Sequence, residues 1–313
     1  HPVHMLLSSG EETAAAINDG SWFDPNTWES GVVPSDGAKV LIPEGITVSY
    51  DQESQARIDT IRVDGGLIFA HDHNTKLIVD TLFSTDNGLL QIGTNEHPIQ
   101  ADKTTQIIID SQDAVSDAMQ LGKGVVLSGV TRIHGAEKLD FVNLQNAQAG
   151  DNKLVLSLPP GNITPEGWRI GDQLVLGGTA YNATGSDADN SRFQDEVLTI
   201  TAINGNEISF TNNDITEGDN TVLRFDHNQP QEFEDQVNLY VANTTRNVSI
   251  RTENGENAPI NNRGHVMFMH NDDVQVKNAG FYELGRSNKN EIVDDLVTNK
   301  DGSEGTGTNI RGR

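Results

Sequence analysis

The feature that most constrains this chain is a repeated unit of an apolar strand-length segment, a glycine turn and a second apolar segment. Residues 58–63 and 67–69 flank Gly65 and Gly66, and the next such unit begins at Leu77, about 20 residues after the first. Apolar side chains at alternating positions predict strands. A repeat of this length buries its apolar face only by stacking on its neighbours. The chain is therefore expected to be all-β, a right-handed parallel β-helix, which is a β-solenoid.

The composition fits many short strands better than helices. Hydrophobic residues make up 35 % of the chain and aromatic residues 5 %, whereas glycine occurs 30 times. Glycine suits the corners of stacked coils, where the backbone needs a positive φ or passes close to a neighbouring turn. Recurrent Val, Ile and Leu runs argue against disorder, the other fold state that such a polar composition would favour.

One region breaks the repeat. Residues 197–203 and 207–210 flank Asn204 and Gly205, a pair that suits a type I′ hairpin turn. This hairpin predicts a small antiparallel β-barrel-like module inserted into the β-helix. The expected division of the chain is an N-terminal leader segment at 1–19, a β-helix domain at 20–150, the inserted module at 151–235 and further coils at 236–313.

The charge of the chain excludes some partners. It carries 46 acidic and 21 basic residues, a net charge of −25, which disfavours nucleic acid and anionic membrane surfaces. No apolar run approaches the ~20 residues of a membrane span, so no membrane insertion is expected. The chain lacks cysteine, which excludes disulfides and thiolate metal sites and favours a bacterial exoprotein. The expected location is secreted or at the cell surface.

Several segments carry a resemblance to a known family. The pair Trp22 and Trp28, residues 40–42 with Gly45, the segments 58–63 and 65–69, and residues 88–93 together resemble the G-eight domain, named for its eight glycines. Beyond them, segments of the later chain resemble those that follow this domain in a group of hyaluronan-depolymerising proteins: residues 133–135, 167–172, 241–248 and Gly264-His265-x4-His270. The resemblance covers nearly the whole chain from Gly20 and implies an extracellular polysaccharide as partner.

The chain departs from that group at its end. In the group, a Gly-Arg pair such as Gly312-Arg313 precedes a run with tyrosine that ends in a His-Phe-His motif, which this sequence lacks. A β-helix that ended here would expose an open coil. We therefore expect either further sequence, or a second chain or a homo-oligomer that caps this end.

The segment 263–286 contains the best candidates for catalysis. It combines three strand-length runs with histidine, arginine and glutamate, and residues about 20 apart can share one face of stacked coils. Arg246, His265, His270 and Glu283 are predicted as catalytic and Arg286 as substrate-binding. A hydrolase needs two carboxyl groups, whereas a lyase needs a base and a cation that neutralises the substrate carboxylate. The structural alternative is a polar ladder with a hydrogen-bonded core histidine.

Further candidates for substrate binding lie elsewhere in the sequence. Asp226 and His227 precede Arg246 by about one coil length. Trp22 and Trp28 either close the first coil with apolar area or form a stacking platform for sugars.

An oxygen-rich segment predicts a metal site. Asp187, Asp189, Asp195 and Glu196 offer carboxylates of the type that Ca²⁺ prefers, without the spacing of an EF-hand. A solvated polar loop is the alternative. The run at residues 71–73, His-Asp-His, is a second place where either a metal or a polar turn is expected.

Two functions of different class follow from these observations. The first is binding, and depolymerisation if the chain is an enzyme, of a uronic-acid-containing, hyaluronan-like polysaccharide by a hydrolase or lyase mechanism. The second is a non-catalytic surface or matrix solenoid that self-assembles or mediates adhesion. An acidic chain repels a polyanion, so the first function requires a bridging cation such as Ca²⁺ or a local basic groove.

Overall fold

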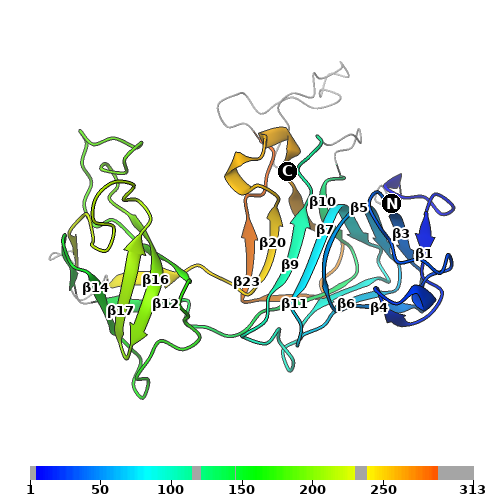
Figure 1. Ribbon diagram of the computed structural model, residues 1–313, viewed down its shortest axis with the longest axis horizontal. Coiled ribbons are helices and arrows are strands. Elements are labelled where there is room, and N and C mark those ends of the chain that lie inside the picture. Colours follow the sequence, from blue (N-terminus) through cyan, green and yellow to red (C-terminus); the bar gives the residue numbers. More distant parts are fainter. Residues whose placement is uncertain (1–4, 115–120, 145, 230–237, 288–313) are drawn as a thin grey trace. The chain divides into compact units, whose positions relative to one another are not determined.

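The computed structural model describes residues 5–114, 121–144, 146–229 and 238–287 (Figure 1). These residues form an all-β protein with three 3₁₀ turns: Pro25–Thr27, Gly255–Asn257 and Ile260–Asn262. The chain divides into two compact units, residues 1–136 with 246–313 and residues 137–245. The described part holds no helix long and apolar enough to cross a membrane.

Two sheets of parallel strands build the first unit. One sheet has the order β1-β3-β5-β7-β9-β20-β23, with β10 pairing both β7 and β21, and the other has the order β2-β4-β6-β8-β11-β22. Figure 1 shows β20 and β23 beside β9 and β7 in the first sheet. The strands of the unit are β1 (Ala14–Ala15), β2 (Gly20–Ser21), β3 (Lys39–Ile42), β4 (Thr47–Tyr50), β5 (Glu53–Val63), β6 (Gly66–Phe69), β7 (Thr75–Ser84), β8 (Leu89–Ile92), β9 (Thr105–Ile109), β10 (Gly124–Leu127), β11 (Val130–His134), β20 (Val248–Thr252), β21 (His265–Phe268), β22 (Val274–Lys277) and β23 (Ala279–Tyr282).

The predicted unit of two strands around a glycine turn is present in β5–β6 and β7–β8. A Cβ on Gly65 would lie 2.2 Å from the carbonyl oxygen of Ile46, and one on Gly88 would lie 2.2 Å from that of Val63. Both corners therefore need glycine because a preceding turn of the chain passes too close for a side chain.

Aliphatic side chains stack in register through this unit. Val40 pairs with Ile61, Ile61 with Leu82, Leu82 with Val125, and Val125 with Val266. The first four of these side chains are fully buried. Each contributes on the order of 1.5–3 kcal/mol through burial of its apolar surface. Because the side-chain period of a strand is two, this register presents the same face of each strand to the core.

The second unit is inserted between β11 and β20. Six of its strands form a closed antiparallel barrel in the order β12-β14-β17-β16-β15-β19, and β13 pairs with β18. Its core consists of aliphatic side chains with Phe210 and Trp168. The strands are β12 (Phe141–Leu144), β13 (Asn146–Ala147), β14 (Lys153–Ser157), β15 (Gln173–Leu176), β16 (Glu196–Asn204), β17 (Glu207–Asn212), β18 (His227–Asn228) and β19 (Leu239–Asn243).

The barrel differs in detail from the sequence expectation. The predicted hairpin is β16–β17, but Asn204 pairs with Glu207, so the turn residues are Gly205 and Asn206. The unit starts before residue 151 and ends after residue 235, because β12 and β19 pair with each other inside the barrel. Strand β19 was expected to belong to the coils. Its alternating pattern fits either environment, so the sequence alone does not distinguish them.

The segment expected to be a leader also joins the fold. β1 lies within residues 1–19 and pairs in parallel with β3. Hydrogen bonds from Thr13 and Ala16 to the carbonyls of Lys39 and Leu41 extend this pairing.

Asn247 holds the chain together where it leaves and re-enters the first unit. Its side-chain amide donates hydrogen bonds to the carbonyls of Ile99 (3.3 Å), Gln100 (3.0 Å) and Lys103 (3.0 Å), and its side-chain oxygen accepts from the backbone N–H of Ala136 (2.9 Å). One side chain thus ties two segments, residues 99–103 and Ala136, to the start of β20.

The substitution Asn247→Ala is expected to lower the free energy of unfolding by about 2–3 kcal/mol, because it leaves several partly buried polar groups without partners. Urea denaturation monitored by circular dichroism measures this loss. The exposed Asn162, changed to alanine, is the matched control and should alter stability by less than about 0.5 kcal/mol. Equal effects of the two substitutions would contradict the role given to Asn247.

Candidate functional site

A polar cleft of about 500 Å³ opens beside β5, β7 and the start of β10. We call it the Asp-Thr cleft, after the two Asp-Thr pairs, 59–60 and 80–81, that line it. Its full lining is Met5, Leu6, Lys39, Asp59, Thr60, Asp80, Thr81, Asp113, Ala114, Gly122 and Lys123.

Strand register places the polar groups of the Asp-Thr cleft. Thr60 pairs with Thr81, and Thr81 pairs with Gly124. The residues immediately before them, Asp59, Asp80 and Lys123, therefore occupy equivalent positions on three neighbouring strands, which lie about 4.7–4.9 Å apart. The Thr60 hydroxyl donates to Asp59 (3.0 Å) and the Thr81 hydroxyl donates to Asp80 (2.8 Å). The same local motif is thus built twice, one coil apart.

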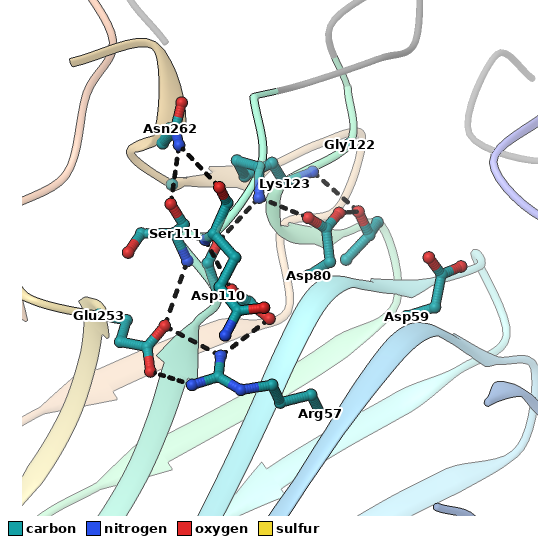
Figure 2. Close-up of polar contacts among 12 residues, drawn as sticks. Arg57, Asp59, Asp80, Asp110, Ser111, Gly122, Lys123, Glu253 and Asn262 are labelled. Atoms are coloured by element: carbon teal, nitrogen blue, oxygen red, sulfur yellow. Dashed lines mark hydrogen bonds and ion pairs between the residues drawn. The ribbon is translucent and has the colours of Figure 1, made fainter. Parts of the chain in front are cut away.

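Lys123 forms one wall of the cleft. Its side chain is almost fully buried, and its ammonium donates to the Asp80 carboxylate (2.6 Å) and to the carbonyl of Asp110 (2.7 Å). A buried charge needs such a partner. Figure 2 shows this contact, with Asp59 standing apart from it. The backbone of Lys123 has φ 54°, a left-handed conformation that costs a residue with a side chain about 1–2 kcal/mol.

An ion-pair cluster supports the same sheet next to the Asp-Thr cleft. The Arg57 guanidinium lies 2.9 Å from Asp110 and 2.5 Å from Glu253 (Figure 2). Arg57 lies in β5, Asp110 directly follows β9, and Glu253 directly follows β20. The cluster therefore links parallel strands from both sides of the insertion and fixes the carbonyl of Asp110 that Lys123 contacts.

The chemistry of the Asp-Thr cleft is that of a hydrogen-bonding surface. Carboxylate oxygens accept hydrogen bonds, hydroxyls both donate and accept, and an ammonium donates. Asp59 and Asp113 are exposed, whereas Asp80 is half-buried against Lys123. The Asp-Thr cleft therefore offers both hydrogen-bond donors and acceptors.

Sequence analysis missed this site although the signal was present. Asp59-Thr60 and Asp80-Thr81 are the same dipeptide, 21 residues apart, each within a strand of the repeat. A search for polar residues recurring at the coil length would have found them.

The structure contradicts the predicted role of Arg286. This side chain is 1 % exposed, and one guanidinium nitrogen donates to the carbonyls of Gly122 (3.3 Å), Lys123 (3.1 Å) and Arg263 (3.2 Å). A buried group that holds three carbonyls of neighbouring segments is not available to a polysaccharide. Its function is structural.

His265 is buried beside Arg286. The second terminal nitrogen of Arg286 donates to Nδ1 of His265 at 3.3 Å, so Nδ1 is the acceptor and a neutral ring carries its proton on Nε2. At 5 % exposure, His265 corresponds to the structural alternative, a hydrogen-bonded core histidine.

The remaining predicted catalytic residues lie on the later strands without converging on His265. His270 is exposed in the turn between β21 and β22, with φ 53°. Glu283 has φ 50° and lies 3.6 Å from Arg251. Burial raises the pKa of Tyr282, and the neighbouring Arg246 and Arg251 oppose that effect. Arg246 precedes β20 and Glu283 follows β23, so these two residues lie at opposite ends of a parallel strand pair, and their catalytic role stays a prediction.

His227 and Glu196 form a buried pair inside the barrel unit, which contradicts their predicted roles in substrate and metal binding. Both side chains are fully buried, with His227 Nε2 2.8 Å from Glu196 and Nδ1 2.9 Å from the carbonyl of Gly177. Both ring nitrogens face oxygen atoms, one of the Glu196 carboxylate and one of the Gly177 carbonyl. Asp226, next in sequence, is exposed and accepts from the backbone N–H of Ala149 (2.9 Å), which is the role of a turn cap.

The four predicted metal ligands do not form one site, because Glu196 is inside the barrel. Asp187 pairs with Arg192 at 3.1 Å, and Asp189 accepts from the backbone N–H of Ser191 at 3.0 Å. Asp195 is contacted through its carbonyl by Asn190. No group of three or more His, Asp or Glu side chains that could hold a metal occurs among the residues that the structure describes. The described residues include the run at 71–73, where His73 pairs with Asp72.

Trp22 and Trp28 are core residues, so their prediction as a sugar platform is wrong. Each is 1 % exposed, their rings meet edge to face at 5.0 Å, and the Trp28 indole donates to the carbonyl of Trp22 at 2.7 Å. Tyr50 contacts the Trp22 ring at 5.4 Å. This burial fits the alternative role, closure of the first coil by large apolar area.

Comparisons with known proteins identify the part of the chain that holds the Asp-Thr cleft. The model of the G8 domain family matches residues 27–145. A G8 domain-containing protein of Dictyostelium discoideum is 26 % identical over 294 residues, which cover 89 % of this chain and 19 % of that protein. Human fibrocystin-L is 24 % identical over 196 residues, 61 % of this chain and 4 % of its own length. Communication mutant protein F of Dictyostelium discoideum is 24 % identical over 305 residues, 89 % of this chain and 25 % of its own.

Two facts limit what these relatives imply. The chain spans a quarter or less of the length of each of them. They are eukaryotic, so they do not show the bacterial origin that the lack of cysteine favoured.

The substitution Arg286→Met is expected to cost about 3 kcal/mol of stability or more, because buried carbonyls lose their donor. Thermal and urea denaturation measure this cost. The control Arg251→Met removes a guanidinium that is 39 % exposed, and should cost less than about 1 kcal/mol. A neutral effect of Arg286→Met would restore this residue as a substrate-binding candidate.

The buried pair of the barrel predicts a pH dependence. Although burial raises the pKa of Glu196, hydrogen bonds from His227, Asn212 and the backbone of Arg224 and Phe225 lower it below its ordinary value of 4.5. Glu196 therefore stabilises the fold above that pH, and this stability is lost as the pH falls towards the lower folded-state pKa.

Glu196→Gln is expected to remove about 3–5 kcal/mol at neutral pH and to flatten the loss of stability on acidification. The measurement is the urea midpoint at several values from about pH 3 to about pH 7, because carboxylates titrate in this range. Glu207→Gln, in an exposed pair with Lys153, serves as the control. If Glu196→Gln lost stability on acidification as steeply as the unmodified protein does, the role given to Glu196 would be contradicted.

Proposed function

We propose that this chain, whose residues 27–145 match the G8 domain family, binds an extracellular polysaccharide along the Asp-Thr cleft. One observation carries the proposal. The two Asp-Thr pairs stand at equivalent positions of adjacent parallel strands and line the same open cleft of about 500 Å³. A site that repeats with the strands suits a ligand that repeats along its own length.

Hydrogen-bond chemistry supports a sugar ligand. Carboxylates and hydroxyls of the Asp-Thr cleft can pair with sugar hydroxyls without a change of charge. Met5 and Leu6, at one side of the cleft, add apolar area for the C–H faces of a sugar ring. Binding sites for small ligands combine apolar surface with a few placed polar groups in this way.

Charge determines how a uronic-acid polymer would bind. The chain has a net charge of −25, and Asp59, Asp80 and Asp113 line the cleft with only Lys39 and Lys123 as cations. A polyanion is repelled unless a divalent cation bridges its carboxylates to those of the protein. The proposal therefore includes Ca²⁺ as a bridging ion for hyaluronan-like polymers.

The proposal extends to depolymerisation through side chains that reach solvent. Asp59 in the cleft and His270 on the later strands are exposed, whereas His265 and Arg286 are buried. A hydrolase mechanism would use carboxyl groups, whereas a lyase mechanism would use a base. We place this activity outside the cell and treat the stacked parallel strands as coils of a right-handed β-helix.

A structural function is the alternative. Within residues 238–287, strands β21, β22 and β23 each pair only with a strand of the preceding coil. Edges of parallel strands can template the addition of another chain. This alternative predicts oligomers or filaments that grow with protein concentration, and a monomer in light scattering would count against it.

Binding of hyaluronan, alginate and polygalacturonate to the full chain, with Ca²⁺ or with a chelator, tests the proposal. We expect Ca²⁺-dependent binding that Asp59→Asn weakens roughly tenfold, since a side chain central to an interface carries more than 1 kcal/mol. Asp86→Asn, at an exposed aspartate in the turn between β7 and β8, is the matched control. Asp59 is chosen because Asp80 holds the buried Lys123, so its loss would affect folding.

The same mixtures report on catalysis. A fall in polymer size with absorbance of unsaturated products indicates a lyase, and a fall without it indicates a hydrolase. If the polymers keep their size, the chain binds them without cleaving them. Absence of binding to any of the three, or equal effects of Asp59→Asn and Asp86→Asn, contradicts the proposed function.

A further inference from the structure

The barrel unit presents aromatic rings to solvent, although the chain is poor in aromatic residues. Phe141 and Tyr240 meet edge to face at 5.1 Å and are 58 % and 43 % exposed. Tyr181 and Phe193 lie 5.8 Å apart and are 64 % and 54 % exposed. More than half of the Tyr181 and Phe193 surfaces therefore stays in water even though each ring has an aromatic neighbour.

The loop between β15 and β16 holds Tyr181 and Phe193 in place. The backbone N–H of Asn182 donates to the carbonyl of Arg192 at 2.9 Å, which joins the two ends of the loop directly beside the rings. The Arg192 guanidinium donates to the carbonyl of Gly185 (3.1 and 3.2 Å) and pairs with Asp187 (3.1 Å). The loop is built by its own hydrogen bonds, so the rings are presented by an ordered scaffold.

Strand register places Tyr240 near the base of that loop. Leu176, the last residue of β15, pairs in antiparallel orientation with Val241, which follows Tyr240 in β19, and the loop begins at the next residue, Gly177. On the other side of β19, Tyr240 pairs with Asn143 of β12, and Phe141 lies on the same strand. The amide of Asn238 donates to the Tyr240 hydroxyl at 3.1 Å. We call the four rings Phe141, Tyr181, Phe193 and Tyr240 the barrel aromatic surface.

We propose that the barrel aromatic surface binds uncharged sugar rings and is a second carbohydrate site, separate from the Asp-Thr cleft. The ligand class rests on the proposed function, whereas the site rests on the exposed rings. An aromatic face offers a rigid apolar surface at low entropic cost, which suits the C–H face of a sugar. Asp187, Arg192 and Asn238 supply polar groups around the rings for the sugar hydroxyls.

Two arguments favour an uncharged glycan over the other possible occupants. The net charge of −25 disfavours a polyanion, and Arg192, the one cation in the loop 177–195 that carries Tyr181 and Phe193, is engaged with Asp187. A protein partner would require one contiguous apolar patch of several hundred Å². Here the rings occur as two pairs with polar side chains around them. This arrangement suits an amphipathic ligand.

Affinity gel electrophoresis of the full chain in laminarin, galactomannan or hydroxyethylcellulose tests the inference. We expect at least one of these neutral polymers to retard the protein. Tyr181→Ala and Phe193→Ala should each weaken the apparent affinity roughly tenfold, as truncation of an aromatic anchor does at other interfaces. Phe193→Trp preserves a stacking ring and should retain binding, which distinguishes lost stacking from a damaged loop. Phe281→Ala, which removes a 38 % exposed ring of the first unit, is the matched control.

The outcomes separate this inference from the proposed function. Retention of neutral-polymer binding in Asp59→Asn, together with its loss in Tyr181→Ala, supports a distinct site even if the Asp-Thr cleft binds nothing. Loss in Asp59→Asn with none in Tyr181→Ala places the ligand in the Asp-Thr cleft and overturns the inference alone. No retardation by any of the three polymers, or retardation that Phe193→Ala leaves unchanged, also overturns it.

Discussion

The first unit depends on the register between parallel strands. Buried aliphatic side chains such as Val40, Ile61 and Leu82 stack strand on strand, and a slip of one residue would turn this face to solvent. The same register aligns the residues next to them. Asp59, Asp80 and Lys123 become neighbours because Ile61, Leu82 and Val125 do. The Asp-Thr cleft is thus a consequence of core packing, and its spacing is that of the sheet.

The insertion leaves this register intact because each unit has its own core. The barrel closes on itself around Leu154, Leu198 and Val241, and so provides the apolar burial that it needs. In the first unit, β20 resumes on β9, and β21 and β22 resume on β10 and β11. A long insertion between coils adds little loop-closure entropy. The two units can therefore carry different binding chemistry, carboxylates with hydroxyls in one and aromatic rings in the other.

The elements that sequence could predict are those with a strong local pattern. The glycine turn at Gly65 and the hairpin β16–β17 each have their signal in one short continuous segment, and both are present. Residue type alone failed at His227, Glu196 and Arg286, because it does not tell which way a side chain points. The sequence does not distinguish a histidine that is buried beside a glutamate inside a barrel from a histidine that lines an open groove. The Asp-Thr repeat was visible in sequence, but its meaning depends on strand register, which only the structure supplies.

We propose that the ligand-binding surface of the first unit is the Asp-Thr cleft and not the segment with His265 and Arg286. Carbodiimide footprinting of carboxylates, with and without a bound uronic-acid polymer, tests it most directly, because Asp59, Asp113 and Glu283 all reach solvent to some degree. We expect the polymer to lower modification of Asp59 and Asp113 and to leave modification of Glu283 unchanged. Protection of Glu283 with continued modification of Asp59 and Asp113 would contradict it.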